Sequence, residues 1–123
     1  MIKNVGIITD SALFLNLNAE LLRKNGYNSQ VHVMQTFSQI EECLNNNTID
    51  LFLIDGALTN MSSMEVIHLL RLQKLTKSPV WLFPEVLTDS YFRRVYSIGV
   101  NRIIKKPFDP YELYEEVINV LNA

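Results

Sequence analysis

The feature that most restricts the fold of this chain is an alternation between short apolar runs and longer stretches with helical periodicity. Three of the five runs are apolar almost throughout, which is typical of strands covered on both faces of a parallel sheet. Alternating β and α units predict an α/β fold, a doubly wound five-stranded parallel sheet in one domain spanning residues 1–123. The predicted strands are residues 5–8, 31–34, 51–54, 80–83 and 102–104, and the first, third and fourth should form the middle of the sheet.

Two patterns predict how the first helices begin and which side they bury. Leu13, Leu17 and Leu21 recur at the spacing of one helix face, so they predict the buried stripe of a helix after the first strand. Ser38 is followed three residues later by Glu41, which is the capping-box pattern of a helix start. We therefore expect the second helix to begin with Ser38 as its N-terminal cap.

The boundaries of the last two helices are marked more strongly. Gly99 follows a helical stretch, and glycine accepts the left-handed backbone with which helices often end. Asp109 is a capping acid that stands before Pro110, and proline is preferred at the first helical position. These signals predict a fourth helix that ends at Gly99 and a fifth that starts at Pro110.

Composition and charge exclude several other classes of protein. The chain is 48% hydrophobic and 20% charged, so it is neither a disordered tail nor a fibrous repeat. Its net charge of −2 argues against a nucleic-acid partner, because a surface that follows phosphates usually has a basic excess. The single Cys43 can form no disulfide within the chain, and no apolar run approaches the roughly 18 residues of a membrane span. We expect a soluble, cytoplasmic protein with no membrane partner.

Charged residues follow the predicted strands at the ends where an open parallel sheet binds ligands. Asp10 follows the first strand, Asp55 the third and Lys106 the fifth, so the three should meet at one rim. Carboxylate oxygens suit Mg²⁺, and an ammonium group neutralises charge on a transferring phosphoryl group. Each residue alone also has an ordinary structural explanation, as a helix cap, the start of a turn or a solvated lysine. Their coincidence at the ends of neighbouring strands favours a site.

Four segments together form a more specific pattern: residues 7–10, 51–55, 78–80 and 99–108, the last of which contains Lys106-Pro107-Phe108. In these segments the chain resembles the response-regulator receiver domain of two-component signalling. The resemblance implies the strand order 2-1-3-4-5, Asp55 as the phosphoacceptor, Lys106 as the lysine that contacts the phosphoryl group, and a cis Lys106-Pro107 peptide. It also implies Mg²⁺ as the cofactor, held by Asp10, Asp55 and the backbone carbonyl of Ala57.

The sequence departs from the pattern of this family at several positions. Thr9 replaces the first of two adjacent acids, which should weaken Mg²⁺ binding. Pro84 stands where the family carries a serine or threonine hydroxyl, and Ile103 stands where an aromatic ring acts as the switch. The Met-Pro and Gly normally found after the acceptor are Leu58-Thr59 and Ser63. The phosphoryl pocket is therefore expected to be partly retained, while the relay that would report phosphorylation has lost two parts.

Two hypotheses for function follow from the resemblance, and a third belongs to another class. In the first, Asp55 accepts a phosphoryl group from a histidine kinase or phosphotransfer protein, with no enzymatic activity beyond phosphorylation and dephosphorylation of Asp55 itself. In the second, the chain is a pseudo-receiver, a protein-interaction module that does not respond to phosphorylation. A flavin-binding flavodoxin-like protein is disfavoured, because Asp10 would place a carboxylate where a cofactor phosphate needs bare N–H groups.

A protein partner is expected on the face formed by the fourth helix, fifth strand and fifth helix, which is the output face of the resembled family. This region is rich in aromatic and arginine side chains, a composition typical of binding surfaces. The alternative is that most of the rings pack inward and show only their hydroxyls. The residues are Tyr91, Phe92, Tyr96, Tyr111 and Tyr114, with Arg93, Arg94 and Arg102.

Overall fold

The computed structural model describes residues 3–16 and 29–122. Within these ranges the strands are β1 (Lys3–Ile8), β2 (Ser29–Met34), β3 (Leu51–Asp55), β4 (Val80–Phe83) and β5 (Arg102–Ile103). The helices are α2 (Phe37–Asn46), α3 (Ser63–His68), α4 (Asp89–Ser97) and α5 (Pro110–Leu121), with a π-helical segment, η1 (Leu69–Gln73), continuing from α3. Residues 12–16 are also helical. None of the helices in the described ranges is both long and apolar enough to cross a membrane.

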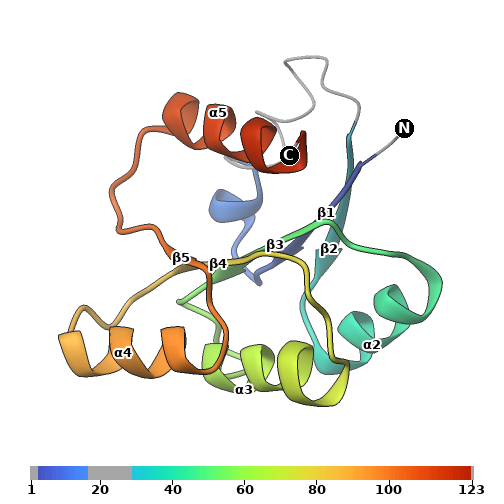
Figure 1. The fold of residues 1–123 in the computed structure, drawn as a ribbon, viewed down its shortest axis with the longest axis horizontal. Coiled ribbons are helices and arrows are strands. Elements are labelled where there is room, and N and C mark those ends of the chain that lie inside the picture. Colours follow the sequence, from blue (N-terminus) through green and yellow to red (C-terminus); the bar gives the residue numbers. More distant parts are fainter. Residues whose placement is uncertain (1–2, 17–28, 123) are drawn as a thin grey trace.

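The five strands run parallel in the order β2-β1-β3-β4-β5, which confirms the predicted sheet. The strands expected in the middle, β1, β3 and β4, have a neighbour on each side. Figure 1 shows α2, α3 and α4 on one face of the sheet and α5 with the helical residues 12–16 on the other. The fold is therefore the doubly wound, flavodoxin-like α/β arrangement, in which the carboxyl ends of the strands share one rim.

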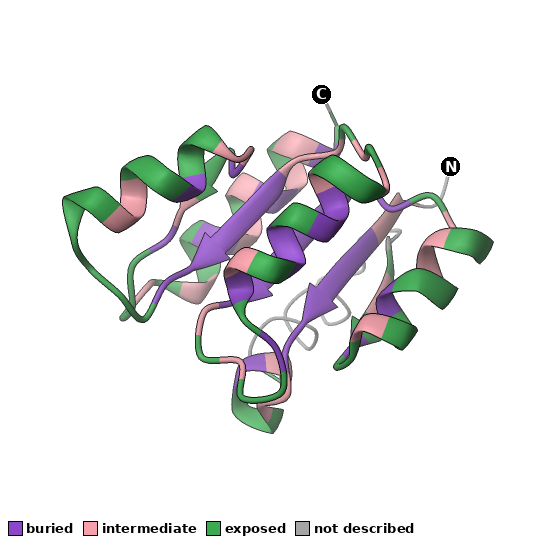
Figure 2. Cartoon of the chain, turned by 90° about the horizontal axis from the view of Figure 1, so that it is seen from below, coloured by how far each residue is buried: buried purple, intermediate pink, exposed green. Residues whose placement is uncertain are grey.

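The middle strands of the sheet are covered on both faces, which explains why most of their residues are apolar (Figure 2). Successive residues of a strand point to opposite faces, and β3 shows this directly. Leu51 and Leu53 pack in the layer that includes α5, whereas Phe52 and Ile54 pack in the layer that includes α2, α3 and α4. All four residues are at most 1% exposed. The polar side chains of these strands therefore lie at the strand ends.

The helical residues after β1 bury a different side chain from the one predicted. Leu13 is 78% exposed, whereas Phe14 is 6% exposed, and the Phe14 ring meets the Phe83 ring edge-on with 4.9 Å between centroids. The prediction of a buried leucine stripe was therefore wrong at Leu13, and Leu17 and Leu21 lie outside the described residues. The physical reason is that an aromatic ring buries more apolar surface than a leucine, so the first turn is oriented by Phe14.

Helix α2 begins two residues earlier than the capping-box pattern suggested. Thr36, and not Ser38, is the N-cap, and its side chain accepts a hydrogen bond from the Gln39 N–H. The Gln39 side chain in turn accepts from the Gln35 N–H at 2.6 Å. Thr36 and Gln39 have the same capping-box spacing as Ser38 and Glu41. The sequence thus allowed two starting points, and the helix takes the earlier one.

The predicted boundaries at Gly99 and Pro110 are confirmed. Gly99 lies in the turn that ends α4, with a φ of +117°, and a Cβ at this position would lie 2.8 Å from the Arg71 side chain. Arg71 Nε donates to the Gly99 carbonyl at 3.0 Å, which joins η1 to this turn. Asp109 caps α5 by accepting from the Tyr111 N–H, and Pro110 occupies the first turn. Glycine at position 99 is required both by the backbone angle and by the close approach of Arg71.

Strand β5 is a short edge strand tied to its neighbours by one arginine. It pairs with β4 through Arg102 opposite Trp81 and Ile103 opposite Leu82. The Arg102 guanidinium lies over the Trp81 ring, 5.5 Å from its centroid, and forms an ion pair with Glu116 of α5 at 2.9 Å. The edge of the sheet is therefore fastened both to the adjacent strand and to the covering helix.

Candidate functional site

The carboxyl end of β3 carries a buried carboxylate that receives hydrogen bonds from three parts of the chain. Asp55 is the last residue of β3 and is 1% exposed. Its Oδ1 accepts from the Ala57 N–H at 2.9 Å and lies 3.3 Å from Lys106 Nζ. Its Oδ2 accepts from Thr9 Oγ1 at 2.7 Å. The structure therefore brings Asp55 and Lys106 together and adds Thr9, which sequence reasoning noted only as a lost acid.

Thr9 is a neutral donor to the buried carboxylate. It is 1% exposed, and its hydroxyl oxygen accepts from the Ser11 N–H at 3.0 Å. Because Ser11 supplies the proton of that bond, the hydroxyl proton of Thr9 belongs to the bond with Asp55 Oδ2. A second carboxylate at this position would instead repel Asp55. A hydroxyl residue directly after β1, beside a buried acid on β3, was the available sequence signal for this contact.

The Lys106 ammonium is shared between two carboxylates. Its Nζ lies 3.3 Å from Asp55 Oδ1 and 3.0 Å from Glu85 Oε1, and 5.6 Å from the centroid of the Phe14 ring. Partial burial by itself lowers the pKa of Lys106, but the hydrogen bond to Glu85 and the charge of Asp55 outweigh burial and leave the pKa raised. The Lys106-Pro107 peptide is cis, as predicted. Glu85 follows Pro84 after the fourth predicted strand, and the sequence analysis did not identify it as a partner of the lysine.

Aromatic rings form an apolar layer beside this ammonium. Phe83, the last residue of β4, is fully buried, and its ring centroid lies 4.9 Å from that of Phe14 and 5.2 Å from that of Phe108. Low-polarity surroundings strengthen the attraction between opposite charges. Phe14 and Phe108 come from segments far apart in the sequence, so their packing on Phe83 also draws the segments after β1 and β5 to one place.

The residue after Asp55 lies directly against the end of β4. The Gly56 N–H donates to the Phe83 carbonyl at 2.8 Å. A Cβ at position 56 would lie 2.4 Å from that oxygen, 2.8 Å from Pro84 Cα and 2.9 Å from the Glu85 nitrogen. These separations are well inside van der Waals contact, so the close approach requires glycine. Gly56 therefore places Pro84 and Glu85 next to Asp55.

Asp10 lies at the same rim in a separate set of contacts. Its Oδ2 accepts from the Thr59 N–H at 3.0 Å and from the Thr59 hydroxyl, and these bonds hold the pKa of Asp10 below its ordinary value. The carboxylates of Asp10 and Asp55 and the Ala57 carbonyl are hard oxygen donors, the kind that Mg²⁺ prefers. Among the described residues, no three His, Cys, Asp or Glu side chains are grouped to hold a metal. The donor set thus fits Mg²⁺ in kind but is low in negative charge.

Comparison with known families agrees with this geometry. The family described as the response regulator receiver domain matches residues 5–118 of the chain. The chain belongs to this family. Receiver domains act in two-component signalling and are in general signalling modules rather than enzymes.

Individual relatives of this receiver domain are distant in sequence. The autoinducer 2 sensor kinase/phosphatase LuxQ of Vibrio vulnificus is 28% identical over 93 residues, which cover 76% of this chain and 11% of that protein. The chain therefore spans about a tenth of the length of this curated relative. A response regulator from Thermotoga maritima superposes over 100% of both chains with a TM-score of 0.81 at 18% identity. The signal receiver domain of the DNA binding response regulator merR from Colwellia psychrerythraea 34H has a TM-score of 0.85 at 16% identity, covering 98% of this chain and 99% of that one. At these identities the solved structures support the fold alone.

Two residues at which this receiver domain departs from the family pattern are apolar: Pro84, which follows β4, and Ile103, the last residue of β5. Pro84 is buried and offers neither a hydroxyl nor an N–H. Ile103 is partly buried and packs against the core layer that includes α2, α3 and α4. Neither side chain can donate a hydrogen bond to a group on Asp55. Pro84 therefore belongs to the packed interior, and Ile103 packs at its margin.

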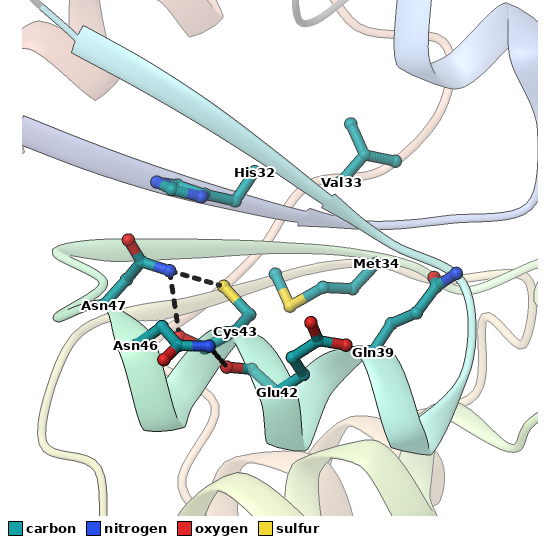
Figure 3. Close-up of a pocket in the computed structure, with 8 residues that line it drawn as sticks. All are labelled: His32, Val33, Met34, Gln39, Glu42, Cys43, Asn46 and Asn47. Carbon is teal, nitrogen blue, oxygen red and sulfur yellow. Dashed lines mark hydrogen bonds between the residues drawn. The ribbon is translucent and has the colours of Figure 1, made fainter.

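Helix α2 and the edge strand β2 line a separate open hollow of about 350 Å³ (Figure 3). His32 and Cys43 are among the residues that line it. His32 Nε2 lies 3.0 Å from Asn4 Oδ1, and Cys43 Sγ lies 3.9 Å from Asn47 Nδ2. Burial raises the pKa of the Cys43 thiol, with the Asn47 contact acting in the opposite direction. These amide contacts account for both side chains as parts of the local packing.

Proposed function

We propose that this receiver domain accepts a phosphoryl group on Asp55 and that Lys106 stabilises the charge of that group. The observation that carries the proposal is the position of Lys106 Nζ, 3.3 Å from Asp55 Oδ1 at the carboxyl ends of the strands. A buried carboxylate faced by an ammonium combines a nucleophile with a group that neutralises incoming negative charge. The Ala57 N–H adds a donor on the same oxygen.

The donor in this proposal is the phosphohistidine of a histidine kinase or phosphotransfer protein. One carboxylate oxygen of Asp55 forms a bond to phosphorus while the phosphorus–nitrogen bond of the donor breaks. The electron pair of that bond stays on the imidazole, which takes up a proton from water. The similarity to LuxQ, whose name describes a sensor kinase/phosphatase, supports a partner of the histidine kinase class.

Mg²⁺ is the cofactor that the donor set supports. Asp10, Asp55 and the Ala57 carbonyl would hold the ion, which would supply positive charge to the phosphoryl oxygens. The Thr9 hydroxyl is already engaged by Ser11 and Asp55. Because a neutral, engaged hydroxyl replaces a carboxylate, we expect weaker Mg²⁺ binding than in a receiver domain with the usual acid pair.

For output, we propose docking of a protein partner on the surface formed by α4, β5 and α5. Tyr96 of α4 and Tyr111 of α5 are 49% and 72% exposed, so both rings are available to a partner. Tyr91, Phe92 and Tyr114 are partly buried and belong in part to the packing. Large exposed aromatic side chains are enriched in protein interfaces.

A pseudo-receiver is the second candidate function, and the two apolar residues Pro84 and Ile103 support it. Pro84 and Ile103 have no side-chain donor that could form a hydrogen bond to a phosphoryl group on Asp55. Ile103 is already packed against the core. In this alternative the surface of α4, β5 and α5 binds its partner whether or not Asp55 is phosphorylated.

Intact mass after incubation with acetyl phosphate and Mg²⁺ tests the proposal. We expect wild-type protein to gain one phosphoryl group and the Asp55→Asn variant to gain none. Chelation of Mg²⁺ should suppress the gain in wild type. A folded wild-type protein that gains no phosphoryl group would overturn the phosphoacceptor proposal in favour of the pseudo-receiver.

A further inference from the structure

The Lys106 ammonium has a second contact that phosphoryl acceptance alone does not require. Glu85 Oε1 lies 3.0 Å from Nζ, closer than the 3.3 Å that separates Nζ from Asp55 Oδ1. Glu85 follows Pro84 at the carboxyl end of β4. The ammonium that would meet a phosphoryl group is therefore already occupied by a carboxylate from a neighbouring loop.

The position of Glu85 is built into the backbone and does not depend on its side chain alone. The Gly56 N–H bonds the Phe83 carbonyl at 2.8 Å, and the backbone nitrogen of Glu85 lies 2.9 Å from where a Cβ of residue 56 would be. The residue after the acceptor and the residue that holds the lysine are thus in direct contact. Asp55 and Glu85 are therefore linked by a short backbone route through Gly56.

We infer that Glu85 is an internal anion that restrains Lys106 and anchors the loop after β4, residues 84–88, until a phosphoryl group on Asp55 displaces it. The inference rests on the proposed function, since the displacing group is the one that Asp55 would accept. Glu85 acts through Lys106, so it is a positioning residue and not a catalytic one.

Charge and exposure both favour the displacement. The side chains of Lys106 and Glu85 are 35% and 55% exposed, and ion pairs with this exposure are weak because water screens them. A phosphoryl group carries between one and two negative charges at neutral pH, and it would be covalently held on the carboxylate that Lys106 already contacts. The lysine is therefore expected to exchange Glu85 for the phosphoryl oxygens.

The loop after β4 would move in the opposite direction from the one expected with a hydroxyl side chain at position 84. A serine or threonine at position 84 would draw the loop inward when the phosphoryl group arrives. In this chain Glu85 holds the loop inward beforehand, and its release frees a segment whose Val86 and Leu87 are already 47% and 58% exposed. Phosphorylation would thus loosen residues 84–88.

The test compares wild type with Glu85→Gln, Glu85→Asp and the control Glu115→Gln. Glu115 is an exposed residue of α5, so its substitution removes the same charge from another surface. Glu85→Asp keeps the charge but shortens the reach to Lys106. We expect both Glu85 variants to take up phosphoryl groups from acetyl phosphate about twofold to fivefold faster than wild type, and Glu115→Gln to match wild type.

Amide spectra supply the readout that does not depend on phosphorylation rate. Without phosphodonor, Glu85→Gln should shift the amides of residues 85–88 toward the positions seen in wild type loaded with beryllofluoride and Mg²⁺. The Lys106 pKa should fall in Glu85→Gln and stay unchanged in Glu115→Gln. Glu85 variants that phosphorylate at the wild-type rate, or amides of residues 85–88 that do not move, would overturn the inference alone. Absence of phosphoryl uptake in every variant would overturn the proposed function, and that result is distinct from equal uptake.

Discussion

Two carboxylates predicted to share one site lie in very different surroundings. Asp55 is enclosed, and it receives hydrogen bonds from Thr9, Ala57 and Lys106, which come from three separate parts of the chain. Asp10 is only partly buried, and both of its side-chain hydrogen bonds described above come from one residue, Thr59. Asp55 is thus part of the framework of the domain, whereas Asp10 is a local attachment at its rim. Stability and metal affinity should therefore respond to different substitutions.

The largest expected difference is between removing Asp55 and removing Asp10. Asp55→Ala leaves the buried Thr9 hydroxyl without its acceptor and takes one of two carboxylates from Lys106, so we predict a loss of about 2–4 kcal/mol in the free energy of unfolding. Asp10→Ala should cost less than about 1 kcal/mol, because its partners reach water. Urea unfolding of both variants measures the difference. A more stable Asp55→Ala variant would mean that the burial cost of the carboxylate exceeds the benefit of its hydrogen bonds.

The contribution of the Thr9 hydroxyl to the free energy of unfolding can be separated from the contribution of the side-chain volume. Thr9→Val keeps the volume but removes the donor to Asp55 Oδ2, and an unsatisfied buried acceptor costs about 1–3 kcal/mol. Thr9→Ser restores the hydroxyl and should recover most of the free energy of unfolding. Equal stability of the valine and serine variants would show that the 2.7 Å contact contributes little.

Thr9→Asp should change both the free energy of unfolding and the affinity for Mg²⁺, because it adds a carboxylate beside Asp55. A charged side chain beside Asp55 adds repulsion in the absence of metal, so the free energy of unfolding should fall without Mg²⁺ and recover when Mg²⁺ is added. One additional carboxylate should tighten Mg²⁺ binding about tenfold, which corresponds to about 1.4 kcal/mol. Titration of a tryptophan or amide signal with Mg²⁺ measures the change. Unchanged affinity would exclude carboxylate count as the limiting factor.

The smallest effect is expected at the Asp10 contact and depends on pH. Hydrogen bonds from Thr59 hold the pKa of Asp10 below its ordinary value of 3.8, so their stabilisation is present above that value and is lost as pH falls through the lowered pKa. Thr59→Val removes the side-chain donor, and the pKa of Asp10 should rise toward 3.8. A carboxyl NMR titration detects the shift. Wild type and variant should converge in stability at strongly acidic pH, and a constant gap would contradict this explanation.

The fold could be predicted because its signals are local and repeated. Residues 51–54 are apolar without interruption, a pattern typical of a strand buried on both faces in an alternating α/β chain. The start of α2 was missed because Thr36 and Ser38 offer equivalent capping boxes two residues apart. The exposed Leu13 was missed because spacing alone does not decide whether Leu13 or its neighbour Phe14 packs on Phe83.

The candidate site was predictable in part for a similar reason. Asp55 ends β3 and Lys106 follows β5, so the shared rim of a parallel sheet brings them together. The role of Thr9 depends on the direction in which its hydroxyl group points. The role of Glu85 depends on the backbone contact at Gly56. Those two features are set by side-chain direction and by close approach between loops, which no spacing in the sequence encodes.

The short strand β5 has a consequence for how the protein behaves in concentrated solution. A long, flat edge strand offers a row of free backbone groups to the sheet of another molecule and so promotes aggregation. Here β5 pairs over only Arg102 and Ile103, and the Arg102 guanidinium is drawn across the edge to Trp81 and Glu116. This edge of the sheet therefore exposes few backbone groups that could pair with a strand of another molecule. Replacement of Arg102 by a β-branched apolar residue would remove that protection while leaving Asp55 unchanged.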